Sequence, residues 1–180
     1  MNRLRVTSTS TKKNTIIMMV GITFFAVLLT LNIIKLVTMN IFQPLEFAFD
    51  ALFLVVLFNR INAKYTCEMY DNCLVFNKSS IWGKKRYDIF YPSIIGIYKY
   101  QPKLVEITKF RRTYRLHSAL DASDVWTIAY TVTTTNGKKE NCRIYFKPGD
   151  LFLGELHRVL PGKVMINEEG VILADIAGSK

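Results

Sequence analysis

Two carboxylates inside an apolar stretch are the residues whose spacing most favours chemistry. Glu46 and Asp50 lie four residues apart in the run IFQPLEFAFDALFLVVLF, so both fall on one face of a helix. An acid at the centre of a bilayer costs roughly 2.5–3.5 kcal/mol and is a functional candidate. Alternatively, the bilayer thins around a short span, which would place both acids near the outer interface beside Asn32 and Lys35. We prefer the interfacial interpretation, and both remain open.

The histidines and serines outside this run lack the spacing that catalysis or metal binding requires. His117 and His157 have no cysteine or second histidine at zinc spacing, and no nucleophile elbow surrounds Ser118. Asp121 lies close to Ser118, but polar clusters of this kind between strands are typical of loops. We therefore expect a protein that is not an enzyme and has no catalytic residue, metal or cofactor.

Two basic groups are candidate contacts for anionic lipid headgroups or for a protein partner. The first group is Lys84, Lys85 and Arg86, and the second is Lys109, Arg111, Arg112 and Arg115, interleaved with Phe110 and Tyr114. Each basic residue near an anionic leaflet contributes about 1 kcal/mol to binding, and the alternative is an ordinary solvated face. A nucleic-acid partner is not expected, because the aromatic residues near these groups are few.

The elements that must position these residues begin with a membrane anchor. The uncharged run TIIMMVGITFFAVLLTLNII, residues 15–34, is long enough to cross a hydrocarbon core of roughly 30 Å. It is longer than the apolar region of a cleaved signal peptide, and no small-residue cleavage site follows it. We predict a transmembrane hairpin over residues 15–59, with spans at about 15–35 and 42–59.

The basic residues that flank the two spans predict the orientation of the hairpin. Residues 1–14 form a basic tail that contains four basic residues and no acid, and Arg60 and Lys64 follow the second span, whereas the connecting loop offers only Lys35. We therefore expect a cell-membrane protein with two spans and both termini in the cytoplasm. This topology accounts for much of the net charge of +10. Three cysteines without framework spacing agree with a reducing compartment.

Residues 60–162 read as a cytoplasmic β domain, because apolar residues alternate with a period of two between turn residues. A turn at residues 71–72 predicts that Met69 pairs with Leu74 and Cys67 with Phe76, which leaves Cys73 on the opposite face from Cys67. For the second hairpin we predict a three-residue loop at 135–137 with Gly137 in the left-handed region. This loop pairs Tyr130 with Cys142, Ile128 with Ile144 and Trp126 with Phe146.

Further strands and one helix complete the predicted domain. Residues 81–90, 93–101 and 104–117 read as strands, and Pro148-Gly149-Asp150 opens an amphipathic helix that Pro161-Gly162 ends. In the extension at 163–180, residues 171–173 read as a short strand. We expect an α+β, mainly β chain: a membrane α-helical hairpin and a seven-stranded antiparallel barrel or sandwich capped by a C-terminal helix.

The order of these patterns resembles a known family. An apolar helical hairpin is followed by YTCEMYDNCLVFN, the glycine turn of WGKKR, the strand SIIGIYKY and finally CRIYFKPGDLFLGELHRVL. This order is similar to that of the bacterial membrane-anchored PH-like domain family. The resemblance covers the hairpin and residues 62–160. It implies a seven-stranded PH-like barrel with a C-terminal helix at the cytoplasmic face of the membrane, and roles in envelope stress or in self-protection against membrane-active peptides for some members.

Two classes of function follow as expectations. The first is a scaffold, sensor or oligomerising module that touches the lipid bilayer and binds a protein partner or a second copy of itself. The second is an accessory subunit of a transport or antimicrobial-peptide immunity system, in which the acids Glu46 and Asp50 take part. The sequence names neither the ligand nor the partner.

Overall fold

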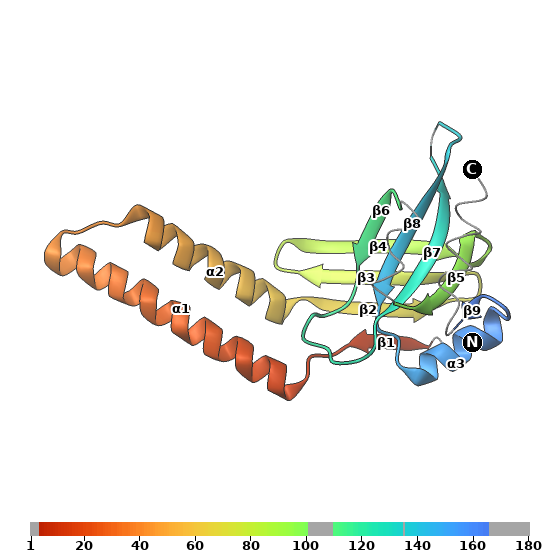
Figure 1. Cartoon of the computed structure of the whole chain (residues 1–180), viewed down its shortest axis with the longest axis horizontal. Helices are drawn as coiled ribbons and strands as arrows, with labels where there is room; N and C mark the ends of the chain where they lie inside the picture. The colour runs from red at the N-terminus through yellow and green to blue at the C-terminus, as the bar shows by residue number, and fades with distance from the viewer. Residues whose placement is uncertain (1–3, 101–109, 135, 166–180) are drawn as a thin grey trace.

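Two long helices extend from one end of a β domain (Figure 1). The structure is a computed structural model that describes residues 4–100, 110–134 and 136–165. Helix α1 covers Lys12–Met39 and helix α2 covers Pro44–Asn62. Asn40 ends α1 in the left-handed conformation that commonly follows a helix C-terminus, and Pro44 begins α2 at a position where its missing N–H is not needed. The chain therefore reverses over a short connection.

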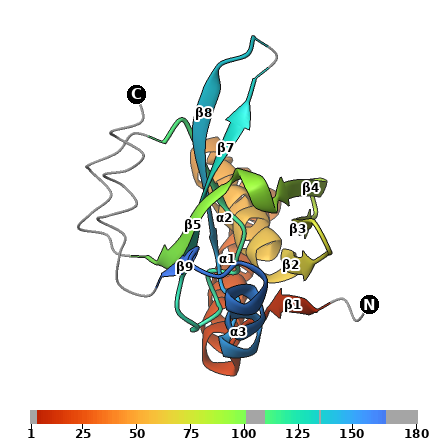
Figure 2. The same cartoon turned by 90° about the vertical axis from the view of Figure 1, so that its right-hand side faces the viewer.

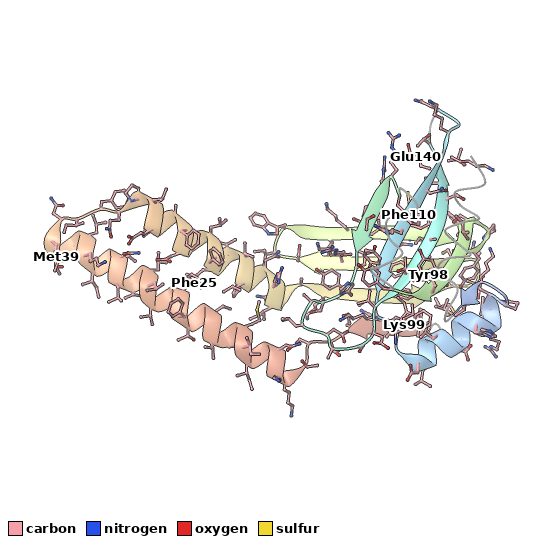
Figure 3. The ribbon with its side chains drawn as sticks, viewed as in Figure 1. Phe25, Met39, Tyr98, Lys99, Phe110 and Glu140 are labelled. Atoms are coloured by element: carbon pink, nitrogen blue, oxygen red, sulfur yellow. The ribbon has the colours of Figure 1, made fainter. Side chains whose placement is uncertain are left out.

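The two helices contact each other through aromatic and small side chains. Phe25 of α1 points toward α2 (Figure 3) and stacks on Phe53, with the ring centroids 4.9 Å apart. Gly21 leaves room for Leu57, whose Cδ1 lies 3.5 Å from the position that a Cβ at residue 21 would take. The opposite surfaces of both helices carry exposed apolar side chains, and no residue of α1 is buried.

Of the helices in the described part of the chain, α1 alone is long and apolar enough to cross a membrane. Its 28 residues extend roughly 42 Å, more than a hydrocarbon core requires. The structure therefore shows one of the two predicted spans as a candidate. Helix α2 extends roughly 28 Å, but its 19 residues include the charged Glu46, Asp50 and Arg60.

The first sheet has four strands in the order β1-β2-β3-β4. The strands are β1 (Arg5–Ser8), β2 (Lys64–Met69), β3 (Cys73–Ser80) and β4 (Gly83–Phe90). The predicted pairs Met69 with Leu74 and Cys67 with Phe76 are confirmed. The segment Arg5–Ser8, which we expected to lie in a basic tail, instead forms a strand because Val6 pairs with Cys67 and packs on the core.

The second sheet has five strands in the order β6-β8-β7-β5-β9. The strands are β5 (Ile94–Lys99), β6 (Arg112–Arg115), β7 (Trp126–Thr133), β8 (Lys139–Phe146) and β9 (Val164–Met165). The predicted β7–β8 register is confirmed, including Ile128 with Ile144 and Trp126 with Phe146. Gly137 in the connecting loop has a φ of 74°, as its predicted left-handed conformation requires.

The α+β class is confirmed, but of the two expected architectures, an antiparallel barrel or sandwich, the described strands do not form a closed barrel. In the described ranges they form two separate sheets, and two of the strand pairs are parallel: β6 with β8 and β5 with β9. The parallel pairs join segments that are distant in sequence, so no turn residue signals them. The strand expected at residues 171–173 lies outside the described residues, as do residues 104–109 of the strand expected at 104–117; of the rest of that segment, Arg112–Arg115 forms β6.

The core lies between the two sheets and is covered at one end by helix α3 (Asp150–Val159). The predicted helix is confirmed, and it lies beside β1 and β9 in both views (Figures 1 and 2). Phe152 and Leu156 face the core, where Phe76 and Phe146 meet edge to face with centroids 5.5 Å apart. A short 3-10 helix, η1 (Tyr91–Ser93), links the first sheet to the second.

Candidate functional site

A polar pair lies between the two long helices. Asn32 of α1 donates a hydrogen bond from Nδ2 to Oδ2 of Asp50 on α2, at 2.9 Å. Asp50 is 6% exposed and is the buried residue of α2. A carboxylate that loses its water must be compensated by a donor, and the Asn32 amide provides one. The pair therefore joins the helices by a polar contact in an otherwise apolar interface.

This pair lies in a groove of about 560 Å³ between the two helices. Lys35 and Glu46 also line the groove, and both are exposed. Its remaining lining is apolar and consists of Phe24, Phe25, Leu28, Leu31, Leu45 and Phe49. The structure thus brings together the four polar residues that the sequence singled out in the helices. The groove offers a carboxylate and a carboxamide at its polar end and an apolar surface along its length.

The depth of the pair follows from its distance along α1. Asn32 lies 20 residues after Lys12, the first residue of α1, which corresponds to roughly 30 Å. That distance equals the thickness of a typical hydrocarbon core. If the basic start of α1 marks one surface of a bilayer, Asn32 and Asp50 reach the opposite surface. Counted along α2, however, Asp50 lies ten residues, or roughly 15 Å, from the basic Arg60, so the interfacial and midplane interpretations of the acids both stay predictions.

Three of the seven candidate basic residues are engaged by carboxylates. Arg86 of β4 pairs with Asp88 at 2.8 Å. Arg111 and Arg112 both face Glu140 of β8, at 3.0 and 3.9 Å, and the Glu140 side chain is only 10% exposed. Glu140 lies at the end of β8 that is remote from the helices (Figure 3). Arg111 and Arg112 therefore help to fasten β6 to β8. All three arginines are less available to an anionic ligand.

The other basic candidates lie near a second groove. Lys85 and Arg115 line a space of about 500 Å³ together with Lys78, Tyr87 and Tyr114. The rings of Tyr87 and Tyr114 are 4.8 Å apart and bridge the two sheets there. Lys84 follows the β3–β4 turn and is exposed, whereas Lys109 lies outside the described residues.

Sequence reasoning missed Lys78 as a member of this groove. It pairs with Lys85 across β3 and β4, and its Nζ lies 5.6 Å from the centroid of the Tyr65 ring. If the residues of the two strands are paired outward from the turn at Gly83, Lys78 falls opposite Lys85. No carboxylate in the described ranges pairs with Lys78, Lys85 or Arg115. The groove is therefore a positively charged surface.

The polar cluster near His117 joins helix α1 to the β domain. Ser8 donates a hydrogen bond to Oδ2 of Asp121 at 2.7 Å and accepts one from the Ser118 N–H at 3.0 Å. The Thr11 N–H and the Asn14 side chain both donate to the Leu120 carbonyl. We call this set of contacts the neck. It gives the cluster a structural role, in agreement with the interpretation of these residues as a loop.

The neck also sets the charge of Asp121. Burial alone would raise the pKa of this carboxyl, but hydrogen bonds from Ser8 and Ser123 outweigh it and hold the pKa below its usual value. The nearby charge of Lys147 acts in the same direction as those hydrogen bonds, and its ammonium donates to the Asp121 carbonyl. Asp121 is thus suited to hold the neck as a carboxylate.

The three cysteines are free thiols. Burial raises the pKa of Cys67 well above its usual value and also raises that of Cys142, and both thiols lie in the core. Cys73 is half-buried and lies on the other face of the sheet from Cys67. Among the described residues, no group of three or more His, Cys, Asp or Glu side chains is placed to hold a metal ion.

Comparison with protein-family models, curated proteins and solved structures finds no match to this chain. The fold and the two grooves therefore assign the protein to a structural class. It is an α+β protein in which a two-sheet domain is hydrogen-bonded to the base of an exposed apolar helix.

Proposed function

We propose that this chain is a membrane-anchored, non-enzymatic interaction module. In this proposal a PH-like domain is held at the cytoplasmic face of a bacterial membrane by the α1–α2 hairpin. There it serves as a scaffold, sensor or oligomerising domain for a protein partner or a second copy. The observation that carries the proposal is the surface of α1, in which 28 largely apolar residues contain no buried side chain. Soluble monomers rarely expose contiguous apolar patches of this size.

The second span is supported by how α2 lies on α1. The helices run side by side over most of their length (Figure 1), so a bilayer that surrounds α1 also surrounds α2. Apolar side chains of α2 face outward, including Leu45, which is 85% exposed, and Phe58. Its charged residues lie near its ends or against Asn32, where a span tolerates them best.

The orientation is supported by charge at the base of the hairpin. Lys12 and Lys13 begin α1, Arg60 lies in the last turn of α2, and the β domain follows at once. Basic residues of this kind are retained on the cytoplasmic side. The PH-like assignment is supported by two facing sheets and a C-terminal helix packed on their common core.

Cysteine accessibility in intact bacterial cells tests the anchor and its topology. In a Cys73→Ser background, we expect Phe42→Cys, between the helices, to react with a membrane-impermeant maleimide from outside. Ser123→Cys, an exposed position of the domain, should react only after permeabilisation. The chain should also resist extraction by alkaline carbonate. Extraction by carbonate would overturn the anchor, and labelling of both positions from the same side would overturn the two-span topology.

A second candidate function is an accessory subunit of a transport or peptide-immunity system. It is favoured by one observation, the buried Asp50 at the polar end of the groove between the helices. Asp50→Asn keeps an acceptor for Asn32 and removes the charge, whereas Asp50→Leu removes both. If the charge of Asp50 is used, both variants abolish protection of expressing cells against a membrane-active peptide. Full protection by Asp50→Leu excludes this candidate.

A further inference from the structure

The turn between β3 and β4 carries two large apolar side chains that the fold does not use. Ile81 and Trp82 are 47% and 74% exposed. Tight turns usually take Gly, Asn, Asp or Pro. Here Gly83 adopts the positive φ of 114°, so nothing in the backbone of the turn calls for Ile81 or Trp82. Their exposure indicates a surface that is covered in the working protein.

The position of this turn suggests what covers it. In Figure 1 the β3–β4 turn reaches past the rest of the domain toward the helices, level with the start of α1 and the end of α2. Those helix ends carry Lys12, Lys13 and Arg60, which mark the surface of the bilayer in the proposed function. A feature at that level meets lipid headgroups if α1 spans the membrane.

The residues around the turn match this environment. Tryptophan is enriched where membrane meets water, because its ring is apolar and its N–H is polar. Lys84 and Lys85 follow the turn, are exposed and have no carboxylate partner in the described part of the chain. Lysines at this height attract anionic lipids. Arg86, the next residue, is paired with Asp88, whereas Lys78, opposite Lys85 on β3, adds a further unpaired charge beside the tip in the described part of the chain.

We propose that the β3–β4 turn is an interfacial anchor. Ile81 and Trp82 enter the headgroup region of the bilayer that α1 crosses, and Lys84 and Lys85 contact anionic headgroups beside them. The domain is then held against the membrane at a second point, separate from the helices. This inference rests on the proposed membrane span of α1, and it adds a fixed orientation of the domain relative to the lipid surface.

Fluorescence of Trp82 in vesicles tests the anchor. The sequence has two tryptophans, so Trp126→Phe leaves Trp82 as the single reporter in the full chain. The chain is reconstituted into vesicles of phosphatidylcholine with phosphatidylglycerol that carry a nitroxide either near the headgroup or deep in the acyl chain. We expect blue-shifted emission and quenching that is several-fold stronger with the shallow nitroxide. If Trp126→Phe does not fold, the difference between the wild type and Trp82→Phe gives the same reading.

Two comparisons separate the possible results. Lys84→Gln with Lys85→Gln should weaken shallow quenching in vesicles that contain phosphatidylglycerol, and Arg86→Gln, which removes an already paired charge, should change it little. Carbonate-resistant chain with an unquenched Trp82 would overturn the anchor and leave the membrane span intact. An unquenched but blue-shifted Trp82 would also overturn it, since a second copy or another protein would then cover the turn. Chain that carbonate extracts would overturn the span and the anchor together.

Discussion

The imidazole of His117, beside the neck, makes the stability of the fold depend on pH. Burial lowers the pKa of His117 below its ordinary value of 6.5, and the positive charges of Lys147 and Arg115 act in the same direction. The hydrogen bond between Nδ1 and the Ser118 carbonyl and the charge of Asp121 act against them without reversing the shift. The folded state therefore prefers the neutral ring.

This preference predicts a stability that falls in mild acid. Because the folded pKa is depressed, the stabilisation is fully present above pH 6.5 and is lost as the pH falls through the folded pKa. We expect His117→Asn to flatten the dependence of the unfolding midpoint on pH below neutrality, measured by tryptophan fluorescence of the full chain in detergent. His157→Asn, at an exposed position of α3, should leave the dependence unchanged. A slope that survives in His117→Asn would contradict this account.

The residues of the helix groove could be foreseen only in part. The four-residue spacing of Glu46 and Asp50 placed them on one face, and the hairpin placed Asn32 and Lys35 near them. The hydrogen bond between Asn32 and Asp50 and the burial of Asp50 depend on how the two helices are rotated against each other. That rotation is set by packing contacts such as Phe25 on Phe53, which no local pattern encodes.

Among the elements, the helix pair depends on close packing near Gly21. A Cβ at this position would lie 3.5 Å from Cδ1 of Leu57, which is ordinary van der Waals contact. Gly21→Ala should therefore keep the helices paired, while Gly21→Leu should force them apart. Disulfide formation between Asn32→Cys and Asp50→Cys in a background without native cysteines measures the pairing, and we expect Gly21→Leu to reduce its yield several-fold. Equal yields for both substitutions would show that Gly21 does not set the approach of the helices.

At the same scale, hairpins were predictable and remote strand pairs were not. The β2–β3 and β7–β8 registers follow from a short turn and a period of two, because a slip of one residue would turn the apolar face outward. The parallel pairing of β6 with β8 joins Arg112 to Cys142, and β9 joins β5 after helix α3 has crossed the end of the core. These contacts depend on the complete fold, and for that reason the barrel alternative of the expected barrel or sandwich was wrong.

At the scale of the whole molecule, strand β1 joins the helical membrane anchor to the β domain. Val6 pairs with Cys67 and faces the core, whereas Thr7, the next residue, is exposed. Val6→Asp places a charge against the core, and we expect it to lower the free energy of unfolding of the full chain by about 1–3 kcal/mol. Thr7→Asp is the matched control and should change it by about 0.5 kcal/mol or less. Denaturant unfolding in detergent measures both, and similar losses for the two variants would show that β1 is not packed on the core.

The order of elements β1, α1, α2, β2 has a mechanical consequence. Strands β1 and β2 are antiparallel neighbours, so the helical hairpin is the connecting loop of a β-hairpin. A piston movement of α1 along α2 would have to drag β1 along β2, which would break their cross-strand hydrogen bonds together and turn Val6 out of the core. The two helices can still tilt or rotate together as one rigid rod. A force that lipids or a partner apply to the helix pair therefore changes the orientation of the β domain and leaves the internal packing of the domain unaltered.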